Sequence, residues 1–178
     1  MGIRRADLQP LVVSAQFDRP ANTTAYASGD LVANDTTASS VTPLTFSFPV
    51  DTTPGNQTAA ADKSILRIER VMISKSTTST TNATFRVHLF STNPLSSSPV
   101  GITNGDNGAF SVNKAGYIGY IDVSAMIAMK DGAVGFAWPT GAMTGLEEAS
   151  LFGFLEAQGA YTPGSAETFA VTIEALRI

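Results

Sequence analysis

The chain has 178 residues and no cysteine, and only 15% of its residues are charged, against about a quarter in an average soluble domain. This length predicts a single domain with a sizeable hydrophobic core, and the absence of cysteine excludes disulfides, thiolate catalysis and cysteine-ligated metal sites. The net charge of −4 and the lack of a dense basic patch argue against nucleic-acid binding, and no apolar run is long enough to span a membrane.

The first ten residues, MGIRRADLQP, have no hydrophobic periodicity. Chain ends of this kind are usually mobile unless a partner holds them, so residues 1–10 are expected to form an arm outside the folded domain at 11–178. The positive start is not followed by an apolar segment long enough for a secretory signal, and no export signal is recognised.

Alternation of apolar and polar residues predicts short strands along the rest of the chain. The first strands are expected at 11–17, near 31–33 and at 44–48. The stretch 64–93 contains two longer runs around a polar tip, and we expect it to form a central hairpin. In its first run the apolar residues change parity after Ile68, so a one-residue β-bulge is predicted near Glu69–Arg70.

The second half of the chain begins with a long irregular stretch, Asn93–Lys114, which is rich in Gly and Pro and is expected to be an exposed functional loop. Strands are predicted at 117–123, along Val134–Trp138, at 150–157 and at 168–178, with a single helical turn after Ser124. A total of about eight or nine strands and almost no helix predicts an all-β fold, an antiparallel β-sandwich or jelly roll.

Catalytic chemistry has little support in the sequence. The single histidine, His88, lies mid-strand, and no motif places a nucleophile or carboxylate beside it. The segment NGDNG (104–108) lacks the spacing and the closing Glu of a calcium loop, so a tight turn is the better interpretation. We therefore predict no catalytic, cofactor-binding or metal-ligating residue, no cofactor, and a protein that is not an enzyme.

Two stretches in this chain together resemble a family of small structural proteins of tailed bacteriophages. One is QFDRPANTTAYASGDLVAN (16–34), and the other is ATFRVHLFSTNP (83–94), which is followed by a long loop and the strand YIGYIDV. The resemblance implies a head decoration (capsid cement) protein of jelly-roll type. Such a protein would be made in the bacterial cytoplasm and would bind the outer surface of the virion as an oligomer, a homotrimer by preference or else a dimer.

On this interpretation the partners are the major capsid protein and other copies of the chain. The low charge favours close docking, because interface cores are depleted in charged residues. The arm and the loop 93–114 lack internal periodicity, so they supply the candidate contact residues: Arg4, Arg5, Leu8, Pro10, Asn104, Asp106, Asn107 and Phe110.

An alternative function is a glycan-binding virion adhesin or tail-associated module. Aromatic residues could form a sugar-stacking platform on the same fold, and the candidates are Tyr26, Tyr117, Tyr120, Trp138 and Tyr161. A jelly-roll metal enzyme is a weaker alternative, because such enzymes usually need several histidine ligands and this chain has one.

Overall fold

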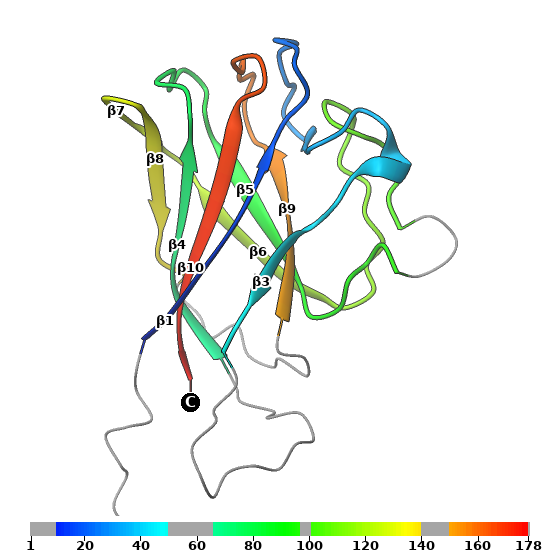
Figure 1. Cartoon of the computed structure of the whole chain (residues 1–178), viewed down its shortest axis with the longest axis vertical. Coiled ribbons are helices and arrows are strands. Elements are labelled where there is room, and N and C mark those ends of the chain that lie inside the picture. The colour runs from blue at the N-terminus through cyan, green and yellow to red at the C-terminus, as the bar shows by residue number, and fades with distance from the viewer. Residues whose placement is uncertain (1–9, 50–65, 97–100, 140–149, 178) are drawn as a thin grey trace, which may run out of the picture.

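The protein is a sandwich of two antiparallel β-sheets, as seen in a computed structural model that describes residues 10–49, 66–96, 101–139 and 150–177 (Figure 1). The first sheet has the order β1-β10-β4-β8-β7, comprising β1 (Pro10–Asp18), β10 (Thr168–Arg177), β4 (Leu66–Lys75), β8 (Gly132–Ala137) and β7 (Ile127–Met129). The second has the order β2-β9-β5-β6 with β3 also paired to β9, comprising β2 (Leu31–Val32), β9 (Ser150–Ala157), β5 (Phe85–Phe90), β6 (Tyr117–Val123) and β3 (Leu44–Ser47). The helical element of the described residues is a short 3₁₀ turn, Ala38–Ser40.

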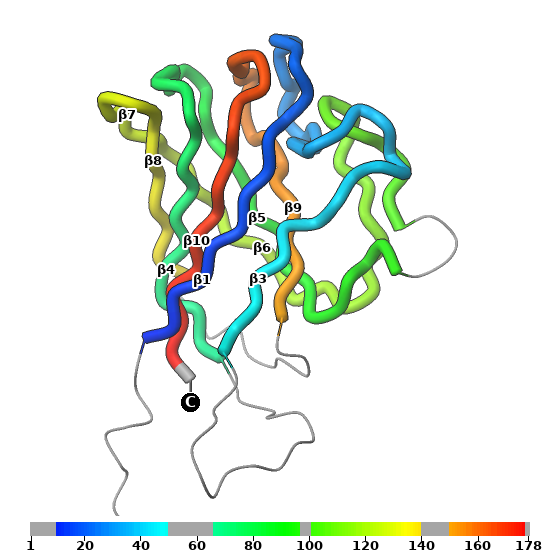
Figure 2. Tube along the Cα trace, viewed as in Figure 1, coloured from blue at the N-terminus to red at the C-terminus, as the bar shows by residue number. Residues whose placement is uncertain are grey.

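The strand order is that of a jelly roll. Apart from the β7–β8 hairpin at one edge, strands from the two halves of the chain alternate in each sheet, so that β10 lies between β1 and β4 and β9 lies between β2 and β5. The tube in Figure 2 follows the chain as it passes between the two layers. The predicted all-β sandwich is therefore confirmed.

The predicted central hairpin is wrong. β4 pairs with β10 and β8 in the first sheet, whereas β5 pairs with β9 and β6 in the second. The polar segment between them therefore carries the chain from one sheet to the other. Each run does form a strand, but neither is the other's partner.

The predicted bulge in β4 is confirmed. Arg70 pairs with Glu174 and Ile68 pairs with Ala175, so Glu69 is an extra residue on the β4 side. The slip brings the apolar residues on both sides of it to one face, and Leu66, Ile68, Val71 and Ile73 are all buried. Without it, half of the strand's apolar residues would face solvent.

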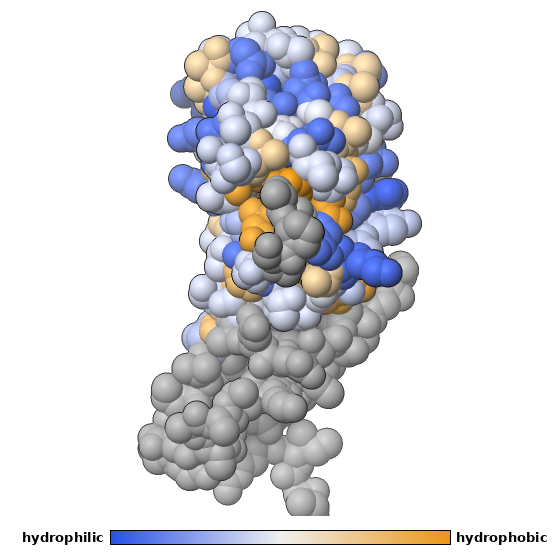
Figure 3. Space-filling view, turned by 90° about the vertical axis from the view of Figure 1, so that its right-hand side faces the viewer, coloured by the Kyte–Doolittle hydropathy of each residue, from blue (hydrophilic) through white to orange (hydrophobic). Residues whose placement is uncertain are grey.

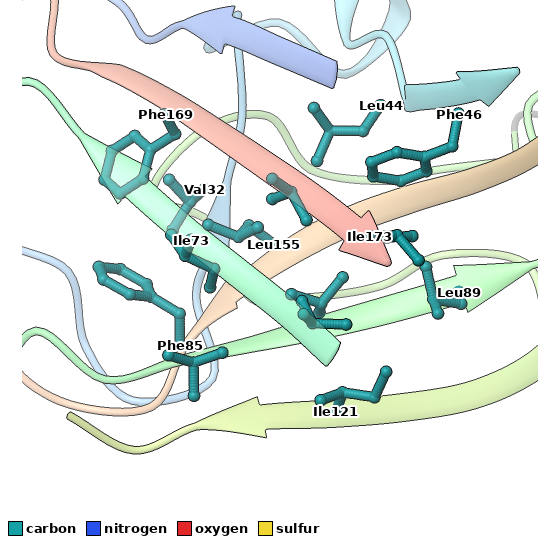
Figure 4. Packing of buried hydrophobic residues seen from close by; sticks show 14 of the residues in the cluster. Val32, Leu44, Phe46, Ile73, Phe85, Leu89, Ile121, Leu155, Phe169 and Ile173 are labelled. Atoms are coloured by element: carbon teal, nitrogen blue, oxygen red, sulfur yellow. The ribbon is translucent and has the colours of Figure 1, made fainter. Parts of the chain in front are cut away.

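The main core fills the space between the sheets, with side chains from both layers interdigitating (Figure 4). Phe169, Val171 and Ile173 of β10 face Phe85, Val87 and Leu89 of β5 across the sandwich. The layers approach closely at Gly135, where an added Cβ would lie 2.6 Å from side-chain atoms of Val123 and Met126. Small residues in a strand often mark such a close approach of another layer.

A second, smaller core lies on the outer side of the second sheet. Leu31, Phe90, Ile102 and Phe154 are buried there, and Phe110 and Val112 pack against them. Residues 101–114 of the predicted exposed loop therefore cover this sheet and contribute buried residues. The helical turn predicted after Ser124 is also wrong, because residues 127–129 form β7, which turns through Lys130 and Asp131 into β8.

Candidate functional site

The eight predicted contact residues differ in their location and burial. Arg4, Arg5 and Leu8 lie outside the described residues, and Pro10 is the exposed first residue of β1, paired with Leu176. Asn104, Asn107 and Phe110 are partly buried, and the predicted tight turn is present: the amide of Gly108 donates to the carbonyl of Gly105 at 3.1 Å.

The predicted contact role of Asp106 is wrong, because its side chain is fully buried and cannot contact a partner in this conformation. Its Oδ2 accepts from Nη2 of Arg19 at 2.9 Å, and its Oδ1 accepts from the hydroxyl of Tyr26 at 2.5 Å and from the amide of Ala33 at 3.0 Å. Desolvation and the neighbouring carboxylate raise the pKa of the Tyr26 phenol well above its usual range. This carboxylate is therefore an internal anchor for the connections at one end of the sandwich.

A second buried ion pair lies beside the first. Nζ of Lys75 donates to Oε1 of Glu167 at 3.1 Å and to the hydroxyl of Tyr161 at 2.9 Å, and both charged side chains are fully buried. The ring of Tyr161 stacks on that of Tyr26 with centroids 6.5 Å apart, which joins the two pairs. Because each charge has its partner and further hydrogen bonds, this cluster fixes the loop arrangement and offers no free group to a ligand.

The outer side of the first sheet carries an exposed apolar surface. The pairs Ile127↔Val134 and Phe136↔Met72 place these residues on the side opposite Ile73 and Gly135, which face the core. Their exposed fractions are 59% for Ile127, 53% for Met129 and 67% for Trp138, whose ring stacks on that of Phe136. We call this surface the β7–β8 face; it consists of Met72, Ile127, Met129, Val134, Phe136 and Trp138.

Charged side chains of both signs lie near the β7–β8 face, including Lys130 and Asp131 in the turn after Met129. Arg70 pairs with Glu174 at 2.8 Å, and Arg67 pairs with Glu69. An open groove of about 390 Å³ adjoins the face, lined by Met129 and Val134 on one side and by small residues such as Ser74 and Ala170. The side of the molecule drawn in Figure 3 is mostly hydrophilic, and its most hydrophobic residues lie mainly near the middle of the view, with paler orange residues scattered around them.

The outer side of the second sheet carries a polar and aromatic surface beside the small core. Cross-strand pairing of β5 with β6 and β9 places Arg86 next to Asp122 and Glu156, and His88 next to Tyr120. We call this surface the β5–β6 face; it consists of Arg86, His88, Phe110, Tyr117, Tyr120, Asp122 and Glu156.

His88 lies at the centre of the β5–β6 face. Its Nε2 lies 2.6 Å from Oε2 of Glu156 and its Nδ1 lies 3.0 Å from the hydroxyl of Tyr117, while its ring stacks on Phe110 with centroids 4.0 Å apart. Since a carboxylate only accepts, Nε2 donates, and the neutral ring accepts the Tyr117 hydroxyl at Nδ1. Burial lowers the pKa of His88 and outweighs the opposing effect of Glu156.

Arg86 and Asp122 form a bidentate pair at the edge of this face, with distances of 2.6 Å from Nε to Oδ1 and 2.9 Å from Nη2 to Oδ2. The guanidinium lies 3.8 Å from the ring centroid of Tyr120. Hydrogen bonding from Arg86 lowers the pKa of the Asp122 carboxyl. The pair therefore stays charged and holds the Tyr120 ring in place.

The sequence missed most of these assemblies. Tyr26 and Tyr161, two candidates for a sugar platform, are buried, and Trp138 lies on the other sheet, so only Tyr117 and Tyr120 are together. The buried pairs join residues 87 and 92 positions apart, which no local pattern could indicate. The carboxylate beside His88 comes from β9, a strand whose partner was not predictable from spacing.

Among the described residues, no helix is long and apolar enough to cross a membrane, and no cluster of His, Asp and Glu side chains is arranged to hold a metal ion. No protein-family model matches the chain, and no curated protein matches it. A crystal structure of a protein of unknown function from Shewanella oneidensis MR-1 aligns over 94% of this chain and 87% of that chain, with 12% sequence identity and a TM-score of 0.24. A similarity of this size supports no statement about fold or function.

Proposed function

We propose that the protein is a virion structural protein, a decoration protein that binds the outside of an icosahedral phage capsid and stabilises the lattice of the major capsid protein. The observation that carries this proposal is the β7–β8 face. Exposed contiguous apolar surface on a soluble domain usually marks a protein interaction site, and an exposed Trp is among the residues most enriched in binding hot spots.

The charge distribution supports a protein partner. Arg67 and Arg70 beside the β7–β8 face are paired with acidic residues, so docking over them would not leave these two charges unpaired, while Lys130 and Asp131 lie in the turn at its edge. The sequence resemblance to tailed-phage structural proteins supplies the identity of that partner. A binder that prefers the assembled shell would stabilise it by mass action, and many copies on a repeating lattice would give avidity.

Two measurements test this proposal. The first is the copy number of the chain in purified particles relative to the major capsid protein. A simple fixed ratio supports a lattice-covering decoration protein, a few copies per particle would move the chain to a vertex or the tail, and absence from particles would refute a virion role.

The second is occupancy on capsid shells that lack the chain. Trp138→Ser combined with Ile127→Ser removes two exposed apolar side chains, and we expect binding to weaken by about tenfold to a hundredfold. Tyr120→Ala, on the other sheet, is the matched control and should bind as the unaltered protein does. Equal binding by all three proteins would exclude the β7–β8 face as the docking surface.

A further inference from the structure

The β5–β6 face has a backbone feature that the sandwich itself does not require. Leu89 pairs with Gly119 and Phe90 pairs with Tyr117, so β6 contains an extra residue at Ile118. Gly119 at this irregularity has a φ of 152°, a conformation that favours glycine. Bulges often re-aim a side chain next to a functional site.

The consequence of this bulge is an unusual pair of tyrosines. In a regular strand, residues three apart point to opposite sides, but here both Tyr117 and Tyr120 are on the outer side of the sheet while Ile121 faces the core. Their exposed fractions are 42% and 52%, and both rings lie about His88, with centroids 5.9 Å and 6.2 Å from it. The strand thus presents two aromatic rings together at a fixed position.

The tyrosines are held by their surroundings. Tyr117 packs on Phe90 with centroids 5.1 Å apart and its hydroxyl bonds to His88, while Tyr120 is held by the guanidinium of Arg86. Carboxylate oxygens of Asp122 lie at the same edge, and the Asp122 side chain is 45% exposed. Rigid aromatic rings beside a few fixed polar groups are the usual composition of a small-ligand site.

From these observations we infer that the β5–β6 face is a binding site for a neutral oligosaccharide, with sugar rings lying against Tyr120 and Tyr117 and sugar hydroxyl groups bonded at the Arg86–Asp122 pair. A sugar ring has an apolar C–H side that packs on an aromatic ring, and hydroxyl groups that both donate and accept. With His88 neutral, Arg86, Asp122 and Glu156 sum to one negative charge, which disfavours an acidic sugar.

This site is separate from the capsid docking proposed above. The outer sides of the two sheets of a sandwich point away from each other, so a protein docked through the β7–β8 face would present the β5–β6 face to solvent. The inference is independent of the docking proposal, because it requires only the isolated chain.

The test is titration of the full chain with maltohexaose, cellohexaose, chitohexaose and mannohexaose, followed by calorimetry and by amide chemical shifts in NMR spectra. We expect at least one of these to bind with a Kd of about a millimolar or tighter and to shift amides of β5 and β6. Tyr120→Ala should weaken that binding about tenfold, equivalent to about 1.4 kcal/mol, because the change removes the ring on which the sugar packs. Trp138→Ala is the matched control, an exposed aromatic on the other sheet, and should leave binding unchanged.

Thermal unfolding of both variants separates lost binding from lost folding, since both side chains are mostly exposed. If Tyr120→Ala is destabilised, Tyr120→Phe, which keeps the ring, should bind normally. No binding by any of the four probes, equal loss in Tyr120→Ala and Trp138→Ala, or shifts confined to other strands would overturn the inference. Binding of a proline-rich peptide at the two tyrosines with no oligosaccharide binding would also overturn it.

Discussion

At the scale of the residue, burial decides which charged groups matter for stability. Asp106→Ala would leave the fully buried guanidinium of Arg19 without its carboxylate. We expect this to lower the free energy of unfolding by about 3–5 kcal/mol, because an uncompensated buried charge is costly. Urea denaturation measures the effect.

The matched control is Asp122→Ala, which breaks the partly exposed pair with Arg86. Solvent screens that interaction, so the expected loss is below about 1 kcal/mol. Similar losses in the two variants would contradict the assignment of Asp106 as an internal anchor.

His88 makes stability depend on pH. Its pKa in the folded protein is below the unfolded value of 6.5, because burial disfavours the charged ring. The unfolded chain therefore takes up the proton first, and stability that is fully present above about pH 6.5 falls as the pH decreases through the folded pKa. The midpoint of urea denaturation, measured from about pH 8 to about pH 5, tests this expectation, because that range lies on both sides of the unfolded pKa.

His88→Gln isolates this contribution, since carboxyl groups titrate in both proteins. The two proteins are compared by how steeply the denaturation midpoint changes with pH, and the difference between these slopes is the effect of His88. A steeper fall in His88→Gln than in the unaltered chain would contradict a lowered pKa for the folded His88 ring.

At the scale of the element, the bulge at Glu69 identifies a residue that β4 can lose. Because Ile68 and Arg70 pair with consecutive residues of β10, deleting Glu69 would leave a regular strand in which Leu66, Ile68, Val71 and Ile73 still share one face. We therefore expect cooperative folding to persist in circular dichroism melts, and its loss would contradict the assignment of Glu69 as the extra residue. Glu69→Ala keeps the register and loses only a surface contact with Arg67, so it should melt close to the unaltered protein.

The elements also show what the sequence could and could not predict. The parity change after Ile68 indicated the bulge, because side-chain alternation is a local property of one strand. Partner choice is not local, since apolar residues with a period of two serve equally well in a hairpin or in two facing sheets. Hence β4 and β5 were found as strands but wrongly paired, and β7 was mistaken for a helical turn because three residues are too few to establish a period.

At the scale of the whole molecule, the sandwich separates its two candidate surfaces. The β7–β8 and β5–β6 faces share no residue and lie on different sheets. We therefore expect variants in the two faces to act independently: Ile127→Ser with Trp138→Ser should lose shell binding and keep oligosaccharide binding, and Tyr120→Ala should do the converse. Combining all three changes should give additive free energies, within about 0.5 kcal/mol. Strong non-additivity, measured by the same two assays, would indicate that the sheets are coupled.

The position of β10 has a consequence for synthesis of the protein on the ribosome. β10 is the last of the described strands, yet it lies inside the first sheet, where it supplies the hydrogen-bonding partners of both β1 and β4 (Figure 1). Until it emerges, β1 has no neighbour in the sheet, and β4 has an open edge that other nascent chains could pair with. The fold is therefore completed after translation of its last strand, and stalled or truncated chains would be prone to aggregate.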